Sequence, residues 1–294
     1  MKKTLRTVFV SFAFLATCLT LLSFNVLADT ATGNFSISSA APTIGDVTLW
    51  NQADADAAIT LSAGSTVTVT ANVTVTDLNG GDDITSAAAT LYHSTAVSGD
   101  SDDENIHLTN SSCVLGATSG NTKVATCRFT MNYMALGGTW TANITATDSS
   151  ALSVSNNDSN TVNDLAALDV TDATINFGSI ALGANSSSAT TMTVRSQGNV
   201  QIDSRFSGND FTCTSGTVPV GNVRYSTSTG TYDSMSSDLT TSPTTQTSFN
   251  LGVRGVATAN GANSDSSEYW TIKAPVSGVA GVCTNTLTVA AIAG

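Results

Sequence analysis

The sequence is poor in charged, basic and aromatic side chains. Of its 294 residues, 11% are charged and 6% aromatic, and 10 lysines and arginines stand against 22 acidic residues. The net charge of −12 argues against nucleic-acid binding, because lysine and arginine contacts with phosphate supply most of that affinity. Anionic lipid is disfavoured for the same reason. Divalent cations are the expected counterions, although acidity also simply keeps a protein soluble.

Signatures of catalysis are also missing. Nucleophilic catalysis needs a base beside a serine or cysteine, and the sequence has two histidines, His93 and His107, and no Gly-x-Ser-x-Gly turn. Its two glutamates, Glu104 and Glu268, and its few aromatic residues are a poor set for cleaving sugars. No phosphate loop or dinucleotide fingerprint is present. We therefore expect a protein that is not an enzyme, with an unrecognised hydrolase as one alternative.

Long apolar runs are absent except at the N-terminus. Three basic residues within the first six precede an apolar run from Val8 to Leu22, and Ala28 ends the segment. This pattern predicts a signal peptide over residues 1–28, with a retained membrane anchor as the alternative. Its removal would leave 7 basic against 22 acidic residues, a net charge of −15. We expect a secreted or cell-surface protein with no transmembrane segment in the mature chain; the periplasm is the alternative compartment.

Strand patterns dominate the rest of the chain. Ser65–Asp77 alternates valine and alanine with threonine and asparagine, and Trp140–Thr147 alternates in the same way. A period of two is typical of a strand with one buried face. Short strands separated by turns rich in glycine, asparagine and serine predict an all-β protein built of sandwiches.

The chain length suggests two domains. Ser149–Asn163 is polar and poor in large apolar residues, so we place the junction there, and strand patterns restart at Leu168. The predicted organisation is an N-terminal tail over 29–40, a first domain over 41–160 and a second over 161–294. The tryptophans are expected in the cores rather than at ligand sites; they are Trp50, Trp140 and Trp270.

Four cysteines follow the predicted signal peptide. They are Cys113, Cys127, Cys213 and Cys283. An even count in an exported protein predicts disulfides, and four cysteines allow three pairings. The predicted division into two domains favours pairing within each domain. Cys113 and Cys127 would then join the two strands of one hairpin, and Cys213 and Cys283 would join an early strand of the second domain to its last strand. A zinc site is the rival interpretation, but no Cys-x-x-Cys or zinc-like histidine spacing occurs.

An acidic turn follows directly on the strand that ends at Asp77. Calcium needs six to eight oxygen ligands, which must converge from a tight turn such as one at Gly80–Gly81. The candidate ligands are Asp77, Asn79, Asp82, Asp83 and Asp148. Asp148 ends another strand and would contribute if the two strand ends meet, and Asp46 is a weaker candidate. The alternative is a solvated turn without metal.

The stretch Val75–Ile84 resembles the Asp-x-Asn-Gly-x-x-Asp-Ile turn of immunoglobulin-like and cadherin-like repeats in prokaryotic surface proteins. The resemblance implies calcium at Asp77, Asn79, Asp82 and Asp83. Ile175–Gly183 and Val194–Val200 resemble the opening strands of immunoglobulin-like modules, which implies a fold and a binding role. The expected fold is therefore two tandem immunoglobulin-like β-sandwich domains after the signal peptide.

The functional hypothesis is a structural or adhesive cell-surface module that contacts other surface proteins, itself or glycans. A secreted or periplasmic ligand-binding protein is the second hypothesis. Strand addition at an open sheet edge would be the mode of assembly, and the tail over 29–39 is the only donor segment that the sequence suggests.

Overall fold

The computed structural model describes residues 31–51, 57–172, 174–254 and 265–294. Within these ranges the chain is all-β, with strands β1 to β20 in antiparallel sheets and three single-turn 3₁₀ helices. The described ranges contain no helix long and apolar enough to cross a membrane. The predicted signal peptide, residues 1–28, lies outside the described residues.

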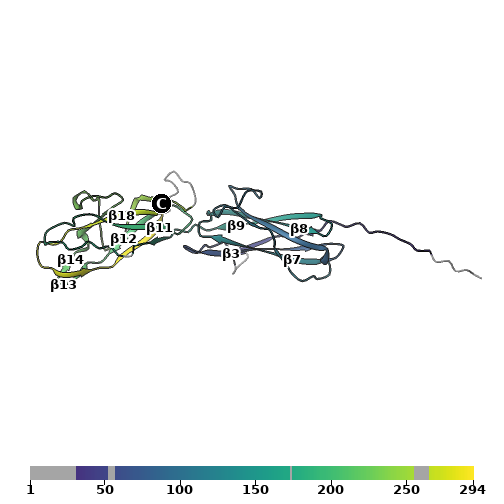
Figure 1. Cartoon of the computed structure of the whole chain (residues 1–294), viewed down its shortest axis with the longest axis horizontal. Helices are drawn as coiled ribbons and strands as arrows, with labels where there is room; N and C mark the ends of the chain where they lie inside the picture. The colour runs from purple at the N-terminus through teal and green to yellow at the C-terminus, as the bar shows by residue number, and fades with distance from the viewer. Residues whose placement is uncertain (1–30, 52–56, 173, 255–264) are drawn as a thin grey trace, which may run out of the picture. The chain divides into compact units, whose positions relative to one another are not determined.

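Two sheets form the N-terminal half of the described chain and lie in two layers (Figure 1). The first contains β1 (Thr43–Ile44), β2 (Thr48–Asn51), β3 (Thr66–Thr76), β6 (Val114–Leu115) and β7 (Thr122–Asn132). The second contains β4 (Ile84–His93), β5 (His107–Asn110), β8 (Gly138–Asp148) and β9 (Ser153–Val162). The helix η1 (Gly81–Asp83) connects β3 to β4 and so links the two sheets.

The period of two in the sequence decides which side chains fill the core between these layers. On β3, Val69, Val73 and Val75 are buried, and on β8 Trp140 and Ile144 are buried. The threonines between them lie on the opposite, outer faces of the sheets. A shift of one residue in the pairing would move these buried side chains to the outer face. Because burial of apolar surface contributes about 25 cal/mol per Å², the alternation fixes the register of both strands.

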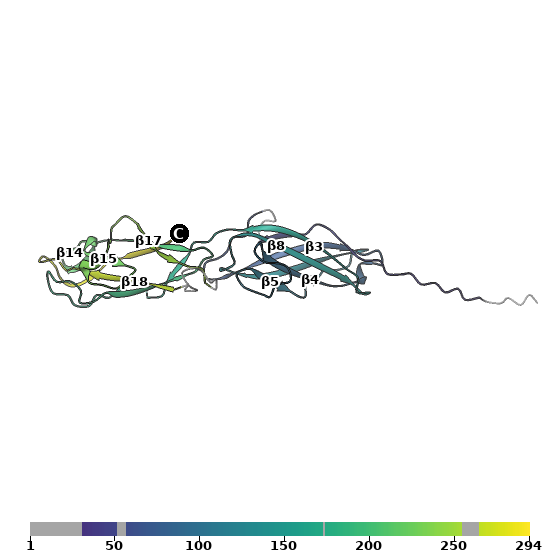
Figure 2. The ribbon, with the colours of Figure 1, turned by 90° about the horizontal axis from the view of Figure 1, so that it is seen from above.

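Three sheets form the C-terminal half (Figure 2). One contains β10 (Leu168–Val170), β11 (Thr190–Ser196), β15 (Val223–Ser226), β16 (Ser237–Asp238) and β18 (Asp265–Ile272). The second contains β12 (Ile202–Gly208), β17 (Thr244–Leu251) and β20 (Leu287–Ala293), and the third β13 (Phe211–Ser215), β14 (Thr217–Val218) and β19 (Ala280–Thr284). Two 3₁₀ helices lie in the loops between strands of this half: η2 (Val220–Asn222) and η3 (Tyr232–Ser234).

An aromatic cluster centres the C-terminal core. The rings of Phe206, Tyr225 and Trp270 lie 4.9 to 5.1 Å apart between centroids, and all three residues are fully buried. The two pairs that involve Phe206 are edge-to-face, and pairs of this kind add about 0.5–1.5 kcal/mol each beyond the burial of their area. Glu268, also fully buried, lies in the same strand as Trp270.

Two of the three tryptophans are core residues, as expected, and the third is not. Trp140 and Trp270 are completely buried. Trp50 is only half-buried, because its neighbour Leu49 faces the core and adjacent strand residues face opposite ways. Trp50 therefore lies on the outer face of the first sheet.

The contacts separate the residues up to Ser38 from a second unit, Ser39–Gly294. Within the second unit, one hydrophobic cluster draws on residues from Val47 to Val162 and another on residues from Met192 to Ile272. The side-chain amide of Asn199 donates to the carbonyls of Ala135 and Asn163. The domain boundaries at 41–160 and 161–294 stay predictions.

Candidate calcium centre

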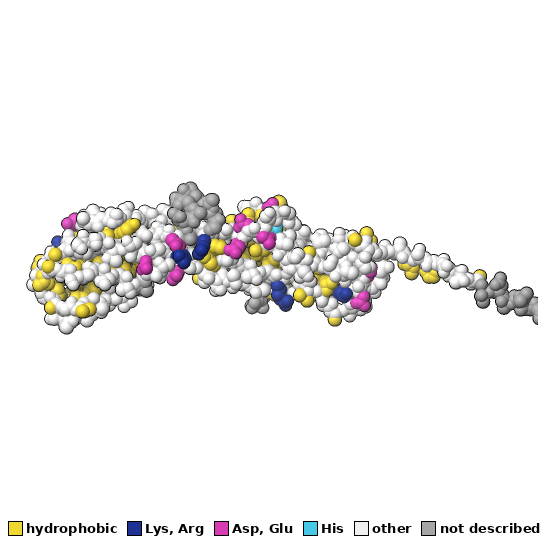
Figure 3. All heavy atoms as spheres, in the orientation of Figure 1, with side chains coloured by type: hydrophobic (Ala, Val, Ile, Leu, Met, Phe, Trp, Pro, Cys, Tyr) yellow, Lys and Arg dark blue, Asp and Glu magenta, His cyan; other side chains and the backbone are white. Residues whose placement is uncertain are grey.

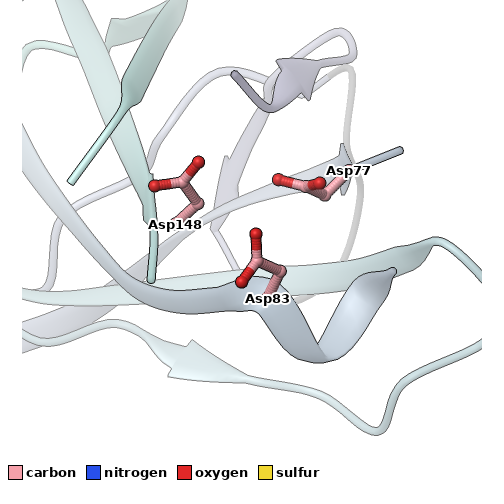
Figure 4. A group of neighbouring side chains, drawn as sticks. All are labelled: Asp77, Asp83 and Asp148. Atoms are coloured by element: carbon pink, nitrogen blue, oxygen red, sulfur yellow. The ribbon is translucent and has the colours of Figure 1, made fainter. Parts of the chain in front are cut away.

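Three aspartates from separate segments meet at one end of the N-terminal sheets. Asp77 follows β3, Asp83 ends η1, and Asp148 ends β8. One carboxylate oxygen from each lies within 4.8 Å of the others (Figure 4). The pairing of Ile84 with Asp148 brings the end of β8 beside the start of β4. The strand ends therefore meet, as the calcium hypothesis required.

Glycines shape the turn that positions Asp77 and Asp83. Gly80 has a φ of 119°, which L side chains rarely adopt. At Gly81 a Cβ atom would lie 2.7 Å from Thr118 Cγ2 and 2.8 Å from the carbonyl oxygen of Thr122, so β7 approaches too closely for any side chain. The turn is closed locally by a 2.7 Å hydrogen bond from the amide of Asn79 to Asp77 Oδ1.

Asp77 is completely buried, and half of its carboxylate has no hydrogen-bond partner. Oδ1 accepts from the amide of Asn79, but Oδ2 is buried and unpaired. A buried polar atom without a partner costs about 1–3 kcal/mol, and more when it carries charge. Such an atom needs an explanation, and here it belongs to the group of three carboxylates.

The other two aspartates are held by hydrogen bonds that fix their orientation. Asp148 is 2% exposed, and its Oδ1 accepts from the amides of Ser150 and Leu152, both at 2.8 Å. Its Oδ2 accepts from the hydroxyl of Ser39 at 3.4 Å. The hydroxyl of Ser149 donates to Asp83. These donors leave carboxylate lone pairs free for another partner.

No positive side chain balances this group in the described part of the chain. The lysine nearest in sequence, Lys123, forms its ion pair with Asp82, at 3.6 Å. Two carboxylates 4.8 Å apart repel by roughly 3 kcal/mol at the effective dielectric constant of protein sites. Bringing three together is therefore costly unless a cation joins them.

The donor set fits a calcium ion. Calcium binds oxygen at about 2.3–2.6 Å, so oxygens on opposite sides of the ion lie about 5 Å apart. The spacing of up to 4.8 Å between the three carboxylate oxygens matches that limit. Asp77, Asp83 and Asp148 would hold the ion, and water or backbone oxygens would complete its six to eight ligands.

The structure separates the five predicted ligands into two groups. Asp77, Asp83 and Asp148 come together. Asn79 is engaged elsewhere, because its Oδ1 accepts from the amide of Ala40 at 2.7 Å and from the hydroxyl of Ser39 at 3.5 Å. Asn79 is connected to Asp148 only through the hydroxyl of Ser39, which contacts both side chains. The weaker candidate Asp46 is exposed and outside the group.

Asp82 faces away from the group. Its side chain is 89% exposed, accepts a hydrogen bond from the hydroxyl of Thr118 and pairs with Lys123. The hydrogen bond from Thr118, and then the charge of Lys123, hold the pKa of Asp82 below its usual value. Sequence alone does not decide which of two adjacent aspartates points inward. It also gave no signal for Ser39 as a partner of Asp148.

Both predicted disulfides are present. Cys113 and Cys127 join with their Cα atoms 4.5 Å apart, and Cys127 lies in β7. Cys213 of β13 and Cys283 of β19 are register partners, with Cα atoms 3.9 Å apart. This second bond reaches β19, the strand before the last, and not the last strand as the sequence suggested.

The two histidines anchor the loop between β4 and β5. His93 Nδ1 lies 2.8 Å from Thr95 Oγ1, and its Nε2 lies 3.2 Å from the carbonyl oxygen of Gly137. His107 Nδ1 lies 3.2 Å from Asp102 Oδ1, and its Nε2 lies 3.3 Å from the carbonyl oxygen of Ser98. Both rings are buried and use both nitrogens in these contacts.

Comparison with known proteins places the chain in no family. No family model matches the sequence. No curated protein matches it. Among solved structures, the chain is similar to the crystal structure of dimeric latent PorU from Porphyromonas gingivalis, with 13% identity and a TM-score of 0.28. The match covers 90% of this chain and 21% of that one, so the chain spans about a fifth of its length. A likeness at this level carries no argument about fold or function.

Proposed function

We propose that this chain is an exported, calcium-stabilised module of the cell surface whose task is contact with other molecules rather than catalysis. The observation that carries the proposal is the buried, unpaired Oδ2 of Asp77 beside the carboxylates of Asp83 and Asp148. Two tandem immunoglobulin-like sandwiches would present the contact surfaces. Two disulfides support export, because such bonds persist in oxidising compartments.

A calcium ion here would join the ends of strands from the two sheets of the N-terminal half. Asp77 follows the first sheet of the N-terminal half, whereas Asp148 ends a strand of the second. An ion between them would tie the two layers together at one end. Through Asp148 and Ser39, it would also order the start of the compact unit at Ser39–Ala40.

The surface is suited to contact without strong charge. The face in Figure 3 is mainly uncharged, with acidic and basic side chains in scattered places. Only 11% of all residues are charged, so hydroxyl and amide groups supply most of the polar surface. Partners that are themselves polar and uncharged, such as other surface proteins or glycans, fit this surface best.

Calcium should raise the unfolding temperature of the purified protein relative to a chelator. With a dissociation constant of about 10 μM, 1 mM calcium would stabilise the folded state by about 2.7 kcal/mol. Asp77→Asn should abolish the shift, and it should not destabilise the protein in chelator because it removes a buried, repelled charge. Asp82→Asn is the matched control and should keep the shift. Equal unfolding temperatures of the wild type in millimolar calcium and in chelator would refute the calcium centre.

The contact role is tested separately by electron microscopy of the purified protein in calcium. Filaments or sheets would support assembly into a surface structure. Persistent monomers would instead favour the ligand-binding alternative, in which the protein acts alone on a small or polymeric ligand.

A further inference from the structure

A row of outward-facing side chains crosses the first sheet at Trp50. Strand pairing places Trp50 of β2 opposite Thr70 of β3, and Thr70 opposite Arg128 of β7. Since neighbouring strands lie about 4.8 Å apart, the Cα atoms of Trp50 and Arg128 are separated by roughly 10 Å. Asn72 and Thr126 form the next row. Two long side chains thus stand on either side of short ones.

This arrangement makes a groove of about 390 Å³. Its lining residues are Trp50, Thr68, Thr70, Asn72, Thr126 and Arg128. Trp50 and Arg128 form the walls, and the threonines and Asn72 form the floor. The groove lies on the face away from the core, because the residues that alternate with these on β3, such as Val69 and Ala71, are buried.

Three features of the groove are unusual for a plain sheet surface. Trp50 is half-buried, whereas the other two tryptophans are completely buried. The amide oxygen of Asn72 is buried beneath the groove and has no hydrogen-bond partner. Arg128 is exposed and has no ion pair with any described carboxylate, in contrast to Arg224, which pairs with Asp238. The groove therefore offers an aromatic face and the N–H groups of an arginine that has no ion pair.

We propose that this groove binds a neutral pyranose unit of a glycan. The face of the Trp50 ring is electron-rich and suits the C–H groups of a sugar ring. The planar guanidinium of Arg128 presents N–H donors side by side, and these can donate hydrogen bonds to two adjacent hydroxyl oxygens of the sugar. The amide group of Asn72 and the threonine hydroxyls can donate to or accept from the hydroxyl groups of the sugar.

The charge of the protein decides between neutral and acidic sugars. With a net charge of −12, the protein repels a polyanion, and one arginine does not reverse that field. A neutral glycan carries no such penalty. The inference deepens the proposed contact function and rests on it, because it names the class of partner and the surface that meets it.

Affinity electrophoresis of the purified protein tests the site. Native gels would contain one soluble polysaccharide each: a glucan, mannan, xylan or galactan as neutral probes, and alginate or polygalacturonate as acidic probes. We expect at least one neutral polysaccharide to retard the wild type. Trp50→Ala should weaken that binding by at least about thirtyfold, as removal of a central aromatic anchor does, and Asn72→Ala should weaken it as well. Thr74→Ala is the matched control, since Thr74 is exposed on β3 outside the groove.

The outcomes separate this site from the wider function. Retardation that is lost in Trp50→Ala and Asn72→Ala but kept in Thr74→Ala supports the site, provided that circular dichroism shows each variant folded. No retardation by any neutral probe, retardation by acidic probes alone, or binding unchanged in Trp50→Ala would overturn it. The calcium shift, measured on the same preparation, reports independently on the calcium-stabilised module, so one proposal can fail while the other stands.

Discussion

Replacing Cys213 and Cys283 together by serine should lower the free energy of unfolding by about 4 kcal/mol. The two residues are 70 positions apart, and closing so long a loop removes much of the conformational freedom of the unfolded chain. The bond also joins β13 to β19, in a sheet whose third strand, β14, has two residues. Few ladder hydrogen bonds therefore hold this sheet if the bond is lost.

Denaturant unfolding of the oxidised wild type and the double variant measures this loss. The matched control replaces Cys113 and Cys127, which are 14 positions apart, and should cost about 3 kcal/mol by the same chain-entropy argument. Losses of this size are large against the total stability of about 5–15 kcal/mol that is usual for a domain. Four free thiols in the native wild-type protein, measured with a thiol reagent, would contradict the prediction.

Glu268→Gln should remove a fall in stability that the wild type shows as the pH rises. Glu268 is completely buried, its Oε1 accepts from the hydroxyl of Ser204 at 3.2 Å, and its Oε2 has no partner. Burial raises the pKa of Glu268 to about 7, and the hydrogen bond from Ser204 opposes the rise. Its titratable neighbour in the core, Tyr225, has its own pKa raised by burial and by the charge of Glu268.

The direction follows from proton binding. Between pH 4.5 and about 7 the folded protein keeps a proton on Glu268 that the unfolded chain has already released. The free energy of unfolding therefore decreases as the pH rises through this window, by roughly 3 kcal/mol in total, and this contribution is flat above it. Glu268→Gln stays neutral throughout, so it should match the wild type near pH 4.5 and be more stable than it above pH 7.

Denaturant unfolding between pH 4 and pH 8 gives the two curves. Glu104→Gln is the matched control, because Glu104 is exposed and should not change the slope. Wild-type and Glu268→Gln curves that run parallel over the whole range would show that Glu268 keeps an ordinary pKa in the folded protein.

The sequence predicted the strands of the N-terminal half better than the rest. A strict alternation of apolar and polar residues runs along the 11 residues of β3 and along Trp140–Thr147 of β8, long enough to define both the strand and its buried face. The C-terminal half has shorter strands, and residues 174–189, between β10 and β11, form no named strand. Serine, threonine and glycine there carry little periodicity, so beyond the link between the strands of Cys213 and Cys283 the sequence did not predict which strands pair.

The candidate sites show where single residues escaped prediction. The end of β3 predicted an acidic turn, but only the pairing of β4 with β8 shows that Asp148 joins Asp77. Trp50 was expected in the core with the other two tryptophans, but it lies on the outer face of the first sheet. Its neighbours Val47 and Leu49 are the buried members of that strand pattern, and alternation then turns Trp50 outward.

Calorimetric titration of the calcium-free protein with calcium tests the central claim most directly. We predict one calcium ion bound per chain in the wild type and in Asp82→Asn, and none in Asp77→Asn or Asp148→Asn. Absence of binding up to millimolar calcium, or binding that survives both Asp77→Asn and Asp148→Asn, would contradict the account.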